Sequence, residues 1–567
     1  MRKPSHLQIF PRLALALAMA VATTSAFAQS WKFGLMSDTQ WTGKDDSKNP
    51  NSVAVEIINQ INQQFIKSGV KFVVQVGDLA NNGSNVALDT RATFAQALYN
   101  AGIGFFPLRG NHDASQTAAI EFQRIFPQTR SGLNNSTPSD ALVTTADYGA
   151  PPANTGAPFI IGTSFSSPAT ATTATGLIGL SYSFVYNNAR FVMLDQFTRT
   201  DGTGSGSANV NNNNIAEQQD WIDRMLAEKP AGGHTFVFGH KNLIGETHID
   251  TLLGSNPAQN ASARNVFIGS LHHHGVRYYI SGHDHLHQRS IITSPDGTSS
   301  VMQIIGASDS SKFYVPAVPS RDSSNNNPAR ETPTSQELNR IGYYIFTVDG
   351  PRVTVDYHSA EVNSTLESGE YIISSTPTLQ FSKRETFGYC LNGKESLVPE
   401  GGSYTVVQQS FEGTTARILA GVNHRTAKDP SGRALTKAVD TGWTRAASAD
   451  APTGNILTLW GMASSLGSSQ TDIYTLSMTY DVKKVRSLRL DSGRFGLATK
   501  GADGKWMNAV DRNSGGSKKF VSGAWNPRYE LGTYGVDSRT HTAWAVINYN
   551  GDFAISPNIQ PAPRQRK

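Results

Sequence analysis

The stretch from residue 30 to residue 113 alternates short apolar runs with amphipathic segments, and this alternation constrains the fold more than any other feature. The apolar runs are SWKFGLM, KFVVQV and IGFFPL, and each has the length of a buried strand. Between the first two runs, residues 52–69 predict a helix that stops at Gly69 and buries one face, formed by Ala54, Ile57, Ile58, Ile61 and Phe65. The segment RATFAQALYNAG before the third run is also helical in pattern. This β-α-β-α-β order predicts parallel strands joined by crossover helices.

The pattern loosens between residues 114 and 233, where long Ser, Thr, Gly and Asn tracts surround a predicted strand pair at 180–196 and a predicted helix at 217–226. Regular structure resumes with four predicted strand segments, at 233–240, 276–285, 301–311 and 343–359. We therefore predict an α/β (α+β) domain over residues 29–385.

Beyond about residue 385 helical periodicity nearly disappears. Residues 474–481 alternate large apolar and small polar side chains, as in a half-buried strand. Asp503-Gly504 and Asn550-Gly551 are strong signals for hairpin turns. This part, residues 386–567, holds five of the eight tryptophans, for which core packing is a commoner use than sugar binding. It is predicted to be a separate all-β, sandwich-like domain.

The first 28 residues have the layout of a secretory signal peptide. A basic start precedes an apolar segment from Leu13 to Ala22, and Ala26-Phe27-Ala28 predicts cleavage after Ala28. No segment approaches the roughly 20 apolar residues that span a membrane, so we expect a secreted or periplasmic protein. Removing this segment and its three basic residues lowers the net charge from +5 to +2, which indicates no nucleic-acid surface. The single cysteine, Cys390, forbids an intramolecular disulfide and is expected to be buried and inert.

Polar side chains follow the apolar runs of the α/β domain, at the point where each run ends. In open α/β sheets, ligands bind outside the carboxyl ends of the strands, because the loops there converge on one crevice. A mixed set of oxygen and nitrogen donors suits Mn, Fe, Zn or Co better than calcium. The candidate metal ligands are Asp38, Gln40, Asp78, Asn111, His240, His283 and His285.

Five short motifs occur in a fixed order: SDTQ, GDLANNG, GNHD, FGH and GHDH. Together they resemble the five sequence blocks of the calcineurin-like metallophosphoesterase family, over about residues 31–360. The resemblance implies two β-sheets packed face to face with helices outside, a four-layer α/β/β/α sandwich. It also implies two divalent metal ions of uncertain identity. One would be held by Asp38, Gln40 and His285, the second by Asn111, His240 and His283, with Asp78 bridging both.

The resemblance implies a phosphoric ester hydrolase, either a phosphatase or a phosphodiesterase, and the signal-peptide layout predicts that it is exported. Two divalent ions bring four positive charges against two carboxylates, so the site would attract a phosphate ester. The metals would lower the pKa of a bridging water, and the resulting hydroxide would attack phosphorus in line. His112 would protonate the leaving alkoxide as general acid, and Asp113 would orient or stabilise its ring. Arg109 is a candidate contact to the phosphate.

The sequence departs from the commonest family pattern at two positions. Gln40 stands where most members have His, and we expect the exchange to shift metal preference towards harder ions without abolishing binding. Asn81 stands where the pattern GDxxD has a second acid, and we expect it to affect ligand orientation.

Two alternatives from other classes stay open. One is a catalytically silent relative that binds a phosphorylated or glycan ligand through the β module. The other is a structural or surface-attachment protein. Three further histidines, His272 to His274, are expected at a solvated helix end or loop, and His287 is expected to face solvent. The substrate is not predicted, because discrimination would lie in the loops of residues 114–233 and 311–340.

Overall fold

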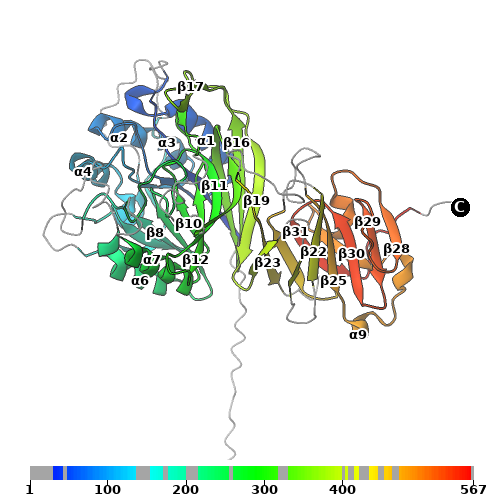
Figure 1. Cartoon of the computed structure of the whole chain (residues 1–567). Helices are drawn as coiled ribbons and strands as arrows, with labels where there is room; N and C mark the ends of the chain where they lie inside the picture. Colours follow the sequence, from blue (N-terminus) through cyan, green and yellow to red (C-terminus); the bar gives the residue numbers. More distant parts are fainter. Residues whose placement is uncertain are drawn as a thin grey trace, which may run out of the picture.

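The computed structural model in Figure 1 describes most of the chain in twelve segments. These are residues 30–42, 48–135, 153–169, 176–199, 215–254, 260–316, 330–398, 403–406, 414–420, 433–444, 453–462 and 472–563. The expected signal peptide, residues 1–28, lies outside the described residues, as do parts of the loops expected to select the substrate.

The first sheet contains the predicted β-α-β-α-β unit. Its six strands are ordered in space as β19 (Ser382–Cys390), β16 (Arg352–Glu361), β15 (Arg340–Asp349), β1 (Trp31–Met36), β2 (Phe72–Val76) and β3 (Gly104–Leu108). The last three strands run parallel, as predicted, and the others pair antiparallel. The expected helix after β1 is α1 (Val55–Ser68), and it ends on Gly69 with a left-handed φ of 66°.

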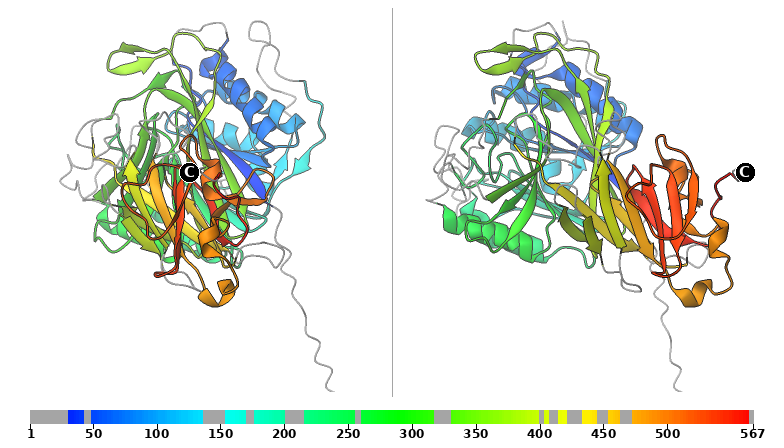
Figure 2. Two further views of the ribbon diagram at one scale, coloured as in Figure 1. Left: turned by 90° about the vertical axis from the view of Figure 1, so that its right-hand side faces the viewer. Right: turned by 45° about the vertical axis from the view of Figure 1, so that its right-hand side comes forward.

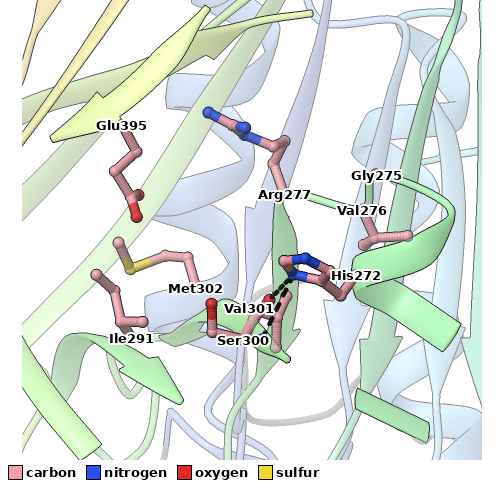
Figure 3. A pocket seen from close by; sticks show the side chains of 9 residues that line it. All are labelled: His272, Gly275, Val276, Arg277, Ile291, Ser300, Val301, Met302 and Glu395. Atoms are coloured by element: carbon pink, nitrogen blue, oxygen red, sulfur yellow. Dashed lines mark hydrogen bonds between the residues drawn. The ribbon is translucent and has the colours of Figure 1, made fainter. Parts of the chain in front are cut away.

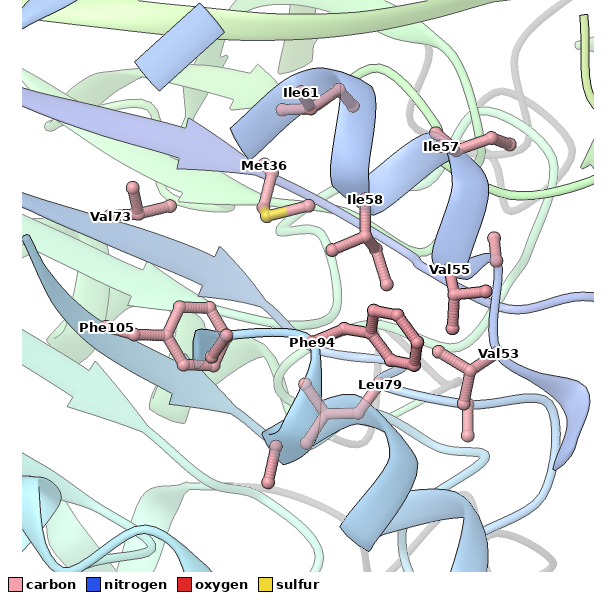
Figure 4. Close-up of a cluster of buried hydrophobic side chains, with 14 of the residues drawn as sticks. Met36, Val53, Val55, Ile57, Ile58, Ile61, Val73, Leu79, Phe94 and Phe105 are labelled. Atoms are coloured by element: carbon pink, nitrogen blue, oxygen red, sulfur yellow. The ribbon is translucent and has the colours of Figure 1, made fainter. Parts of the chain in front are cut away.

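The helices of this half cover one face of the first sheet. Figure 4 shows Ile58 of α1 pointing towards the strands that carry Met36 and Val73, and Ile57 and Ile61 belong to the same buried cluster. The remaining helices on this side are α2 (Asn85–Thr93), α3 (Gln96–Asn100), α4 (Gln116–Ile125) and α5 (Gln128–Ser131).

The second sheet has eight strands, and the predicted strand pair at 180–196 is its β7–β8 hairpin. Strands β8, β9, β10 and β12 run parallel at its centre. Helices α6 (Gln219–Ala227) and α7 (Ala261–His273) cover its outer face. The spatial order is β14 (Glu331–Glu337), β11 (His287–Thr293), β12 (Ser300–Ile305), β10 (Tyr278–Ser281), β9 (His234–Gly239), β8 (Ala189–Leu194), β7 (Tyr182–Tyr186) and β6 (Thr163–Ser166).

The two sheets pack face to face through a largely aromatic core. The ring of Phe33 from the first sheet lies 5.2 Å from that of Phe191 and 5.1 Å from that of Phe236, both from the second sheet, between centroids. With helices outside each sheet, this is the predicted α/β/β/α sandwich. The domain also contains two small sheets. One pairs β4 (Leu133–Asn134) with β5 (Phe159–Ile160). The other is ordered β13 (Lys312–Phe313), β18 (Glu370–Ile372) and β17 (Thr365–Glu367).

The C-terminal part is a β-sandwich of two six-stranded sheets. One is ordered β20 (Lys394–Val398), β23 (Lys437–Thr444), β24 (Ile456–Trp460), β31 (Gly551–Ser556), β26 (Gly496–Lys500) and β27 (Trp506–Asn508). The other is ordered β21 (Ser403–Val406), β22 (Thr414–Ala420), β25 (Ile473–Thr479), β30 (Thr542–Ile547), β29 (Thr533–Asp537) and β28 (Lys519–Ser522). A short helix, α9 (Val482–Val485), lies between strands. Trp443, Trp460 and Trp544 are buried, so most of the module's tryptophans are used in packing.

The two hairpin signals of this module have different outcomes. Asp503-Gly504 joins the antiparallel strands β26 and β27, and Gly504 has the positive φ, 74°, that the turn needs. The hairpin expected at Asn550-Gly551 is wrong, because β30 and β31 belong to different sheets. Here the Asn550 side chain bonds instead to the main chain of Met462, at 2.9 and 2.6 Å, and the chain crosses from one sheet to the other.

The β module is attached along the edge of the first sheet. Strand β19 pairs with β16 and also lies beside β23, and the expected boundary at residue 386 falls inside this strand. Figures 1 and 2 show the module packed against one side of the α/β domain. Cys390, at the end of β19, is buried as expected, and burial raises the pKa of its thiol. Among the described helices, none is long and apolar enough to cross a membrane.

A cavity of about 200 Å³ lies at the border of the two parts (Figure 3). It is lined by His272 at the end of α7, Arg277 before β10 and Glu395 of β20, and by none of the candidate metal ligands. The His272 ring bonds through Nδ1 to the carbonyl of Ser300 at 3.1 Å. His272, His273 and His274 therefore form the exposed or half-exposed helix end that was expected.

Candidate metal centre

The carboxyl ends of five strands from both sheets meet at one edge of the sandwich, and the structure brings all seven candidate ligands together there. Two groups have the proximity that a metal ion requires. Asp38, Asp78 and His285 form one, and Asp78, His240 and His283 form the other. In each group the ligand atoms lie within 4.8 Å of one another, and every member is buried. Because Asp78 belongs to both groups, the geometry is that of two adjacent sites with one shared carboxylate.

Asn111 and Gln40 lie beside these two groups. The amide oxygen of Asn111 is 3.0 Å from His240 Nε2, which is itself 3.4 Å from Asp78 Oδ1. Gln40 donates from Nε2 to Asp78 Oδ2 at 2.7 Å. On the other side, His285 Nε2 is 3.5 Å from Asp38 Oδ1. Asn111 therefore lies beside the group that contains His240, and Gln40 contacts the carboxylate that the two groups share.

The backbone at four of the candidate ligands is left-handed. The φ angles are 44° at Asp38, 46° at Asp78, 71° at His283 and 54° at His285. Residues with a Cβ adopt this region rarely and at some cost, and such strain concentrates where a binding site requires it. The concentration of these conformations on the candidate ligands indicates a functional site independently of any sequence motif.

Main-chain carbonyl groups fix the orientation of two of the rings. His240 Nδ1 lies 2.9 Å from the carbonyl of Val76, and His285 Nδ1 lies 2.8 Å from the carbonyl of Lys312. A carbonyl oxygen only accepts, so Nδ1 must carry the proton in each ring. The unprotonated Nε2 is then available as a metal ligand, which is the usual arrangement around a protein-bound metal.

The electrostatics of the site fit a bound cation. Burial raises the pKa of Asp38 to about 7; its neighbour Asp78 also raises it, while His240 opposes the rise. Burial also acts to raise the pKa of Asp78, but the nearby His240 and His112 have the larger effect and hold that pKa well below its usual range. Two buried carboxylates side by side require positive charge to be ionised together. Within the described part of the chain, the buried Oε1 of Gln40 has no hydrogen-bond partner, which leaves an acceptor for a metal ion.

His112 is half-buried and lies beside the shared carboxylate. Its main-chain N–H donates to Asp78 Oδ1 at 3.0 Å, and its ring Nδ1 lies 2.8 Å from the carbonyl of Asn81. The expected orienting contact from Asp113 to this ring is wrong, whereas an electrostatic interaction between the two groups is present. The Asp113 carboxylate instead accepts from the amides of Leu79 at 2.7 Å and Gly110 at 3.3 Å, and so ties the two motif loops together. Asn81 contacts the His112 ring through its main-chain carbonyl and not through its side chain. Having Asn here, in place of the second acid of the GDxxD pattern, therefore removes no contact to that ring.

Arg109 does not point to a substrate, contrary to expectation. Its guanidinium is fully buried and pairs with both oxygens of Asp195, at 2.8 and 3.0 Å. It also donates to Thr198 Oγ1 at 2.7 Å and to the carbonyl of Asp113 at 3.2 Å. These bonds occupy the donors that a phosphate would need, so Arg109 is a buried support of the loop after β3.

His287 is buried, and its expected exposure to solvent is wrong. It begins strand β11, and its ring stacks on Tyr357 with centroids 4.0 Å apart. Its Nδ1 lies 2.7 Å from the hydroxyl of Tyr344, and its Nε2 lies 3.2 Å from Glu385. Of the three alternating histidines in ISGHDHLHQ, two reach the metal groups and the third supports the packing of β11 on the first sheet.

Three residues that the sequence did not single out complete the surroundings. The ring of His248 lies 4.2 Å from that of His283, and Asp250 Oδ1 lies 3.2 Å from His283 Nε2. The Tyr314 ring lies 4.9 Å from that of His285 and 4.8 Å from that of His248. His248 and Asp250 come from the irregular loop after β9, where no periodicity or motif marks them.

A four-layer α/β/β/α sandwich with a carboxylate shared between two candidate ligand groups is a metallophosphoesterase-type fold. Residues 32–287 match the family model described as calcineurin-like phosphoesterase. No curated protein sequence matches the chain.

Solved structures of similar fold are distant in sequence. Purple acid phosphatase PPD1 from seeds of yellow lupin (Lupinus luteus) is 15% identical with a TM-score of 0.35, over 58% of this chain and 51% of that chain. The chain thus spans about half the length of that protein. PhoD is 14% identical over 64% of this chain and 70% of its own, with a TM-score of 0.37. A dimetal phosphatase from Danio rerio is 16% identical over 57% of this chain and 95% of its own, with a TM-score of 0.31.

Proposed function

We propose that the protein is an exported, metal-dependent hydrolase of phosphoric esters. The observation that carries the proposal is the pair of buried ligand groups that share Asp78. Two metal ions bridged by one carboxylate are the arrangement that stabilises both the attacking and the leaving oxygen of an in-line displacement at phosphorus.

The ligand assignment follows the two groups. Asp38, Gln40 and His285 would hold one ion, and Asn111, His240 and His283 would hold the other, with Asp78 between them. The rings of His240 and His285 support this division, because His240 Nε2 lies 3.4 Å from Asp78 Oδ1, whereas His285 Nε2 lies 3.5 Å from Asp38 Oδ1. The mixed donor set favours Mn, Fe, Zn or a similar ion.

When bound, the metal ions would supply Lewis-acid activation of the phosphoryl group and of a water nucleophile. The chain's own groups would do two things during the reaction. Asp78 would hold the two sites at a fixed separation. His112, with Nδ1 fixed on the carbonyl of Asn81, would present Nε2 to the leaving alkoxide and deliver a proton to it. The half-buried position of His112 gives a substrate access to this ring.

The test is a metal-reconstitution assay. Mature protein is stripped of metal, reloaded with Mn, Zn, Fe, Ni or Mg, and assayed on p-nitrophenyl phosphate and bis-p-nitrophenyl phosphate. We expect metal-dependent turnover, and the preferred ester separates a monoesterase from a diesterase. His112→Ala should lower kcat by about 10²–10⁴-fold with both ions retained, and Asp78→Asn should lower metal content as well. His273→Ala, at the exposed end of α7, is the matched control and should leave kcat unchanged.

A binding protein is the outcome that would replace this proposal. If the protein binds two metal ions but hydrolyses neither ester with any metal, the centre is catalytically silent. Ligand binding through the β module would then be the favoured function. Export is tested separately, by determining the N-terminus of the protein isolated from cells that produce it. We expect it to begin at Gln29 in the extracytoplasmic fraction; a retained Met1 would contradict export by cleavage.

A further inference from the structure

An arginine of the β module inserts into the α/β domain. Arg433, four residues before β23, reaches two buried glutamates of that domain. Its Nη2 lies 2.8 Å from Glu246 Oε2, and its Nη1 lies 3.0 Å from Glu331 Oε2. The side chains are 10%, 0% and 2% exposed for Arg433, Glu246 and Glu331. This is a desolvated contact between parts of the chain that are 187 positions apart.

The two glutamates need that positive charge. Burial and the neighbouring charge of Glu331 raise the pKa of Glu246 well above its usual value, and Arg433 acts in the opposite direction. Ser290 donates to Glu331 at 2.6 Å, and Gln288 lies 3.3 Å from both carboxylates. These neutral donors satisfy lone pairs, the raised pKa of Glu246 favours a proton on the pair, and Arg433 offsets the negative charge that the pair retains.

Glu246 belongs to the loop 242–250, which leaves β9 directly after His240. The carboxylate of Asp284, which stands between the candidate ligands His283 and His285 in the sequence, accepts hydrogen bonds from several residues of this loop. It accepts from Asn242 Nδ2 at 2.8 Å and from Thr247 Oγ1 at 2.7 Å. The main-chain N–H of Glu246 also donates to Asp284. The loop is therefore fixed from inside by Asp284 and from the β module by Arg433.

This loop carries two side chains to the metal ligands. His248 bonds through Nδ1 to Asp284 at 2.7 Å and lies against the His283 ring. Asp250 lies 3.2 Å from His283 Nε2, and a carboxylate in that position fixes the orientation of a ligand ring. A displacement of Glu246 would move His248 and Asp250 with it.

We propose that the C-terminal β module completes the metal centre, with Arg433 as a positioning residue that holds loop 242–250 against the ligand His283. The kinetic part of this inference rests on the proposed hydrolase function, whereas the holding of the loop does not. The module is then a part of the catalytic unit and not an independent appendage.

The test compares two interdomain arginines in the full chain. Arg433→Met removes the charge at loop 242–250. Arg352→Met is the matched control, since Arg352 also crosses the border, to Asp552 at 2.9 Å, but lies at the far end of the first sheet, where Val348 pairs with Trp31. We expect Arg433→Met to lower kcat by about tenfold or more with little change in KM, and to speed amide hydrogen exchange in peptides covering 242–250. Arg352→Met should change neither.

The possible outcomes separate the two proposals. Equal kcat and equal exchange in the two variants would overturn the role of Arg433. If Arg433→Met does not fold, Arg433→Lys keeps the charge without the two-pronged geometry, and it should show intermediate exchange and intermediate kcat. If the wild-type protein has no turnover, the proposed function fails, but faster exchange of 242–250 in the Arg433 variant alone would still support the positioning role.

Discussion

The main chain of Gly110 lies directly against the carboxylate of Asp78. A Cβ added at Gly110 would lie 1.9 Å from Asp78 Oδ1 and 2.3 Å from the Asp78 nitrogen. The GNHD motif thus needs glycine at position 110 because the candidate ligand Asp78 leaves no room for a Cβ, and not because a turn conformation demands it. Its neighbours Asn111 and His112 reach the site only because the two loops approach this closely.

Gly110→Ala is therefore expected to displace Asp78 and to lower both metal content and kcat, by about tenfold or more. Metal content by elemental analysis and the ester assay measure the two effects. Gly269→Ala is the control, because its nearest neighbour, Ser299 Oγ, is 3.8 Å from the added Cβ. In the interior of α7 that change should stabilise the fold by about 0.5–1 kcal/mol and leave kcat unchanged. Full activity of Gly110→Ala would contradict the steric argument.

Arg109→Leu should destabilise the protein by about 3–5 kcal/mol, because it leaves Asp195 buried and without its ion-pair partner. Urea or guanidinium unfolding measures the loss. The double variant Arg109→Leu with Asp195→Leu should regain part of it, since both charges are then gone. A stable single variant with a strongly raised KM would instead support the phosphate-contact role that the structure contradicts.

The cluster of candidate ligands could be predicted from the sequence because its members follow the ends of strands. Parallel strands place their carboxyl ends at one edge of a sheet, so Asp38 and Asp78 converge in the first sheet, and the face-to-face packing of the sheets brings His240 of the second sheet to them. The layer order followed from the family resemblance, because the alternation by itself predicted only parallel strands with crossover helices.

The rest depended on contacts between distant parts of the chain. His248 and Asp250 lie in an irregular loop, which is fixed by Asp284 and by Arg433 from far along the sequence. His287 follows the ligand His285 by two positions, yet β11 buries it because β14 and the tyrosines of the first sheet cover it. Asn550-Gly551 has the composition of a hairpin, but the next strand pairs with β24 and β26.

Gln40→His should tighten zinc binding relative to manganese, by about tenfold. The amide oxygen of Gln40 is a hard donor, whereas an imidazole nitrogen suits zinc better. Competition with a coloured chelator gives both affinities. Gln40→Leu, which keeps the volume and removes the donor, should weaken binding of both metals at one of the two sites. An unchanged zinc-to-manganese ratio in Gln40→His would show that position 40 does not contact metal.

His234 should make the fold less stable below about pH 6.5. The residue is buried at the start of β9, with Nδ1 2.9 Å from the hydroxyl of Tyr389 and Nε2 2.8 Å from the carbonyl of Gly350. Burial lowers its pKa below the usual 6.5, so between the two values the unfolded chain binds a proton that the folded chain does not. Stability from this group is then complete above pH 6.5 and is lost as the pH falls.

The measurement is the change in Tm between pH 7.5 and pH 5.5 for the wild type and for His234→Gln, at one fixed metal concentration. Gln can still donate to the Gly350 carbonyl and accept from Tyr389, but it does not titrate. The fall in Tm should be smaller in the variant, while contributions from the metal-ligand histidines cancel in the comparison. Equal falls in the two proteins would mean that His234 becomes protonated without unfolding, and that its burial does not hold it neutral.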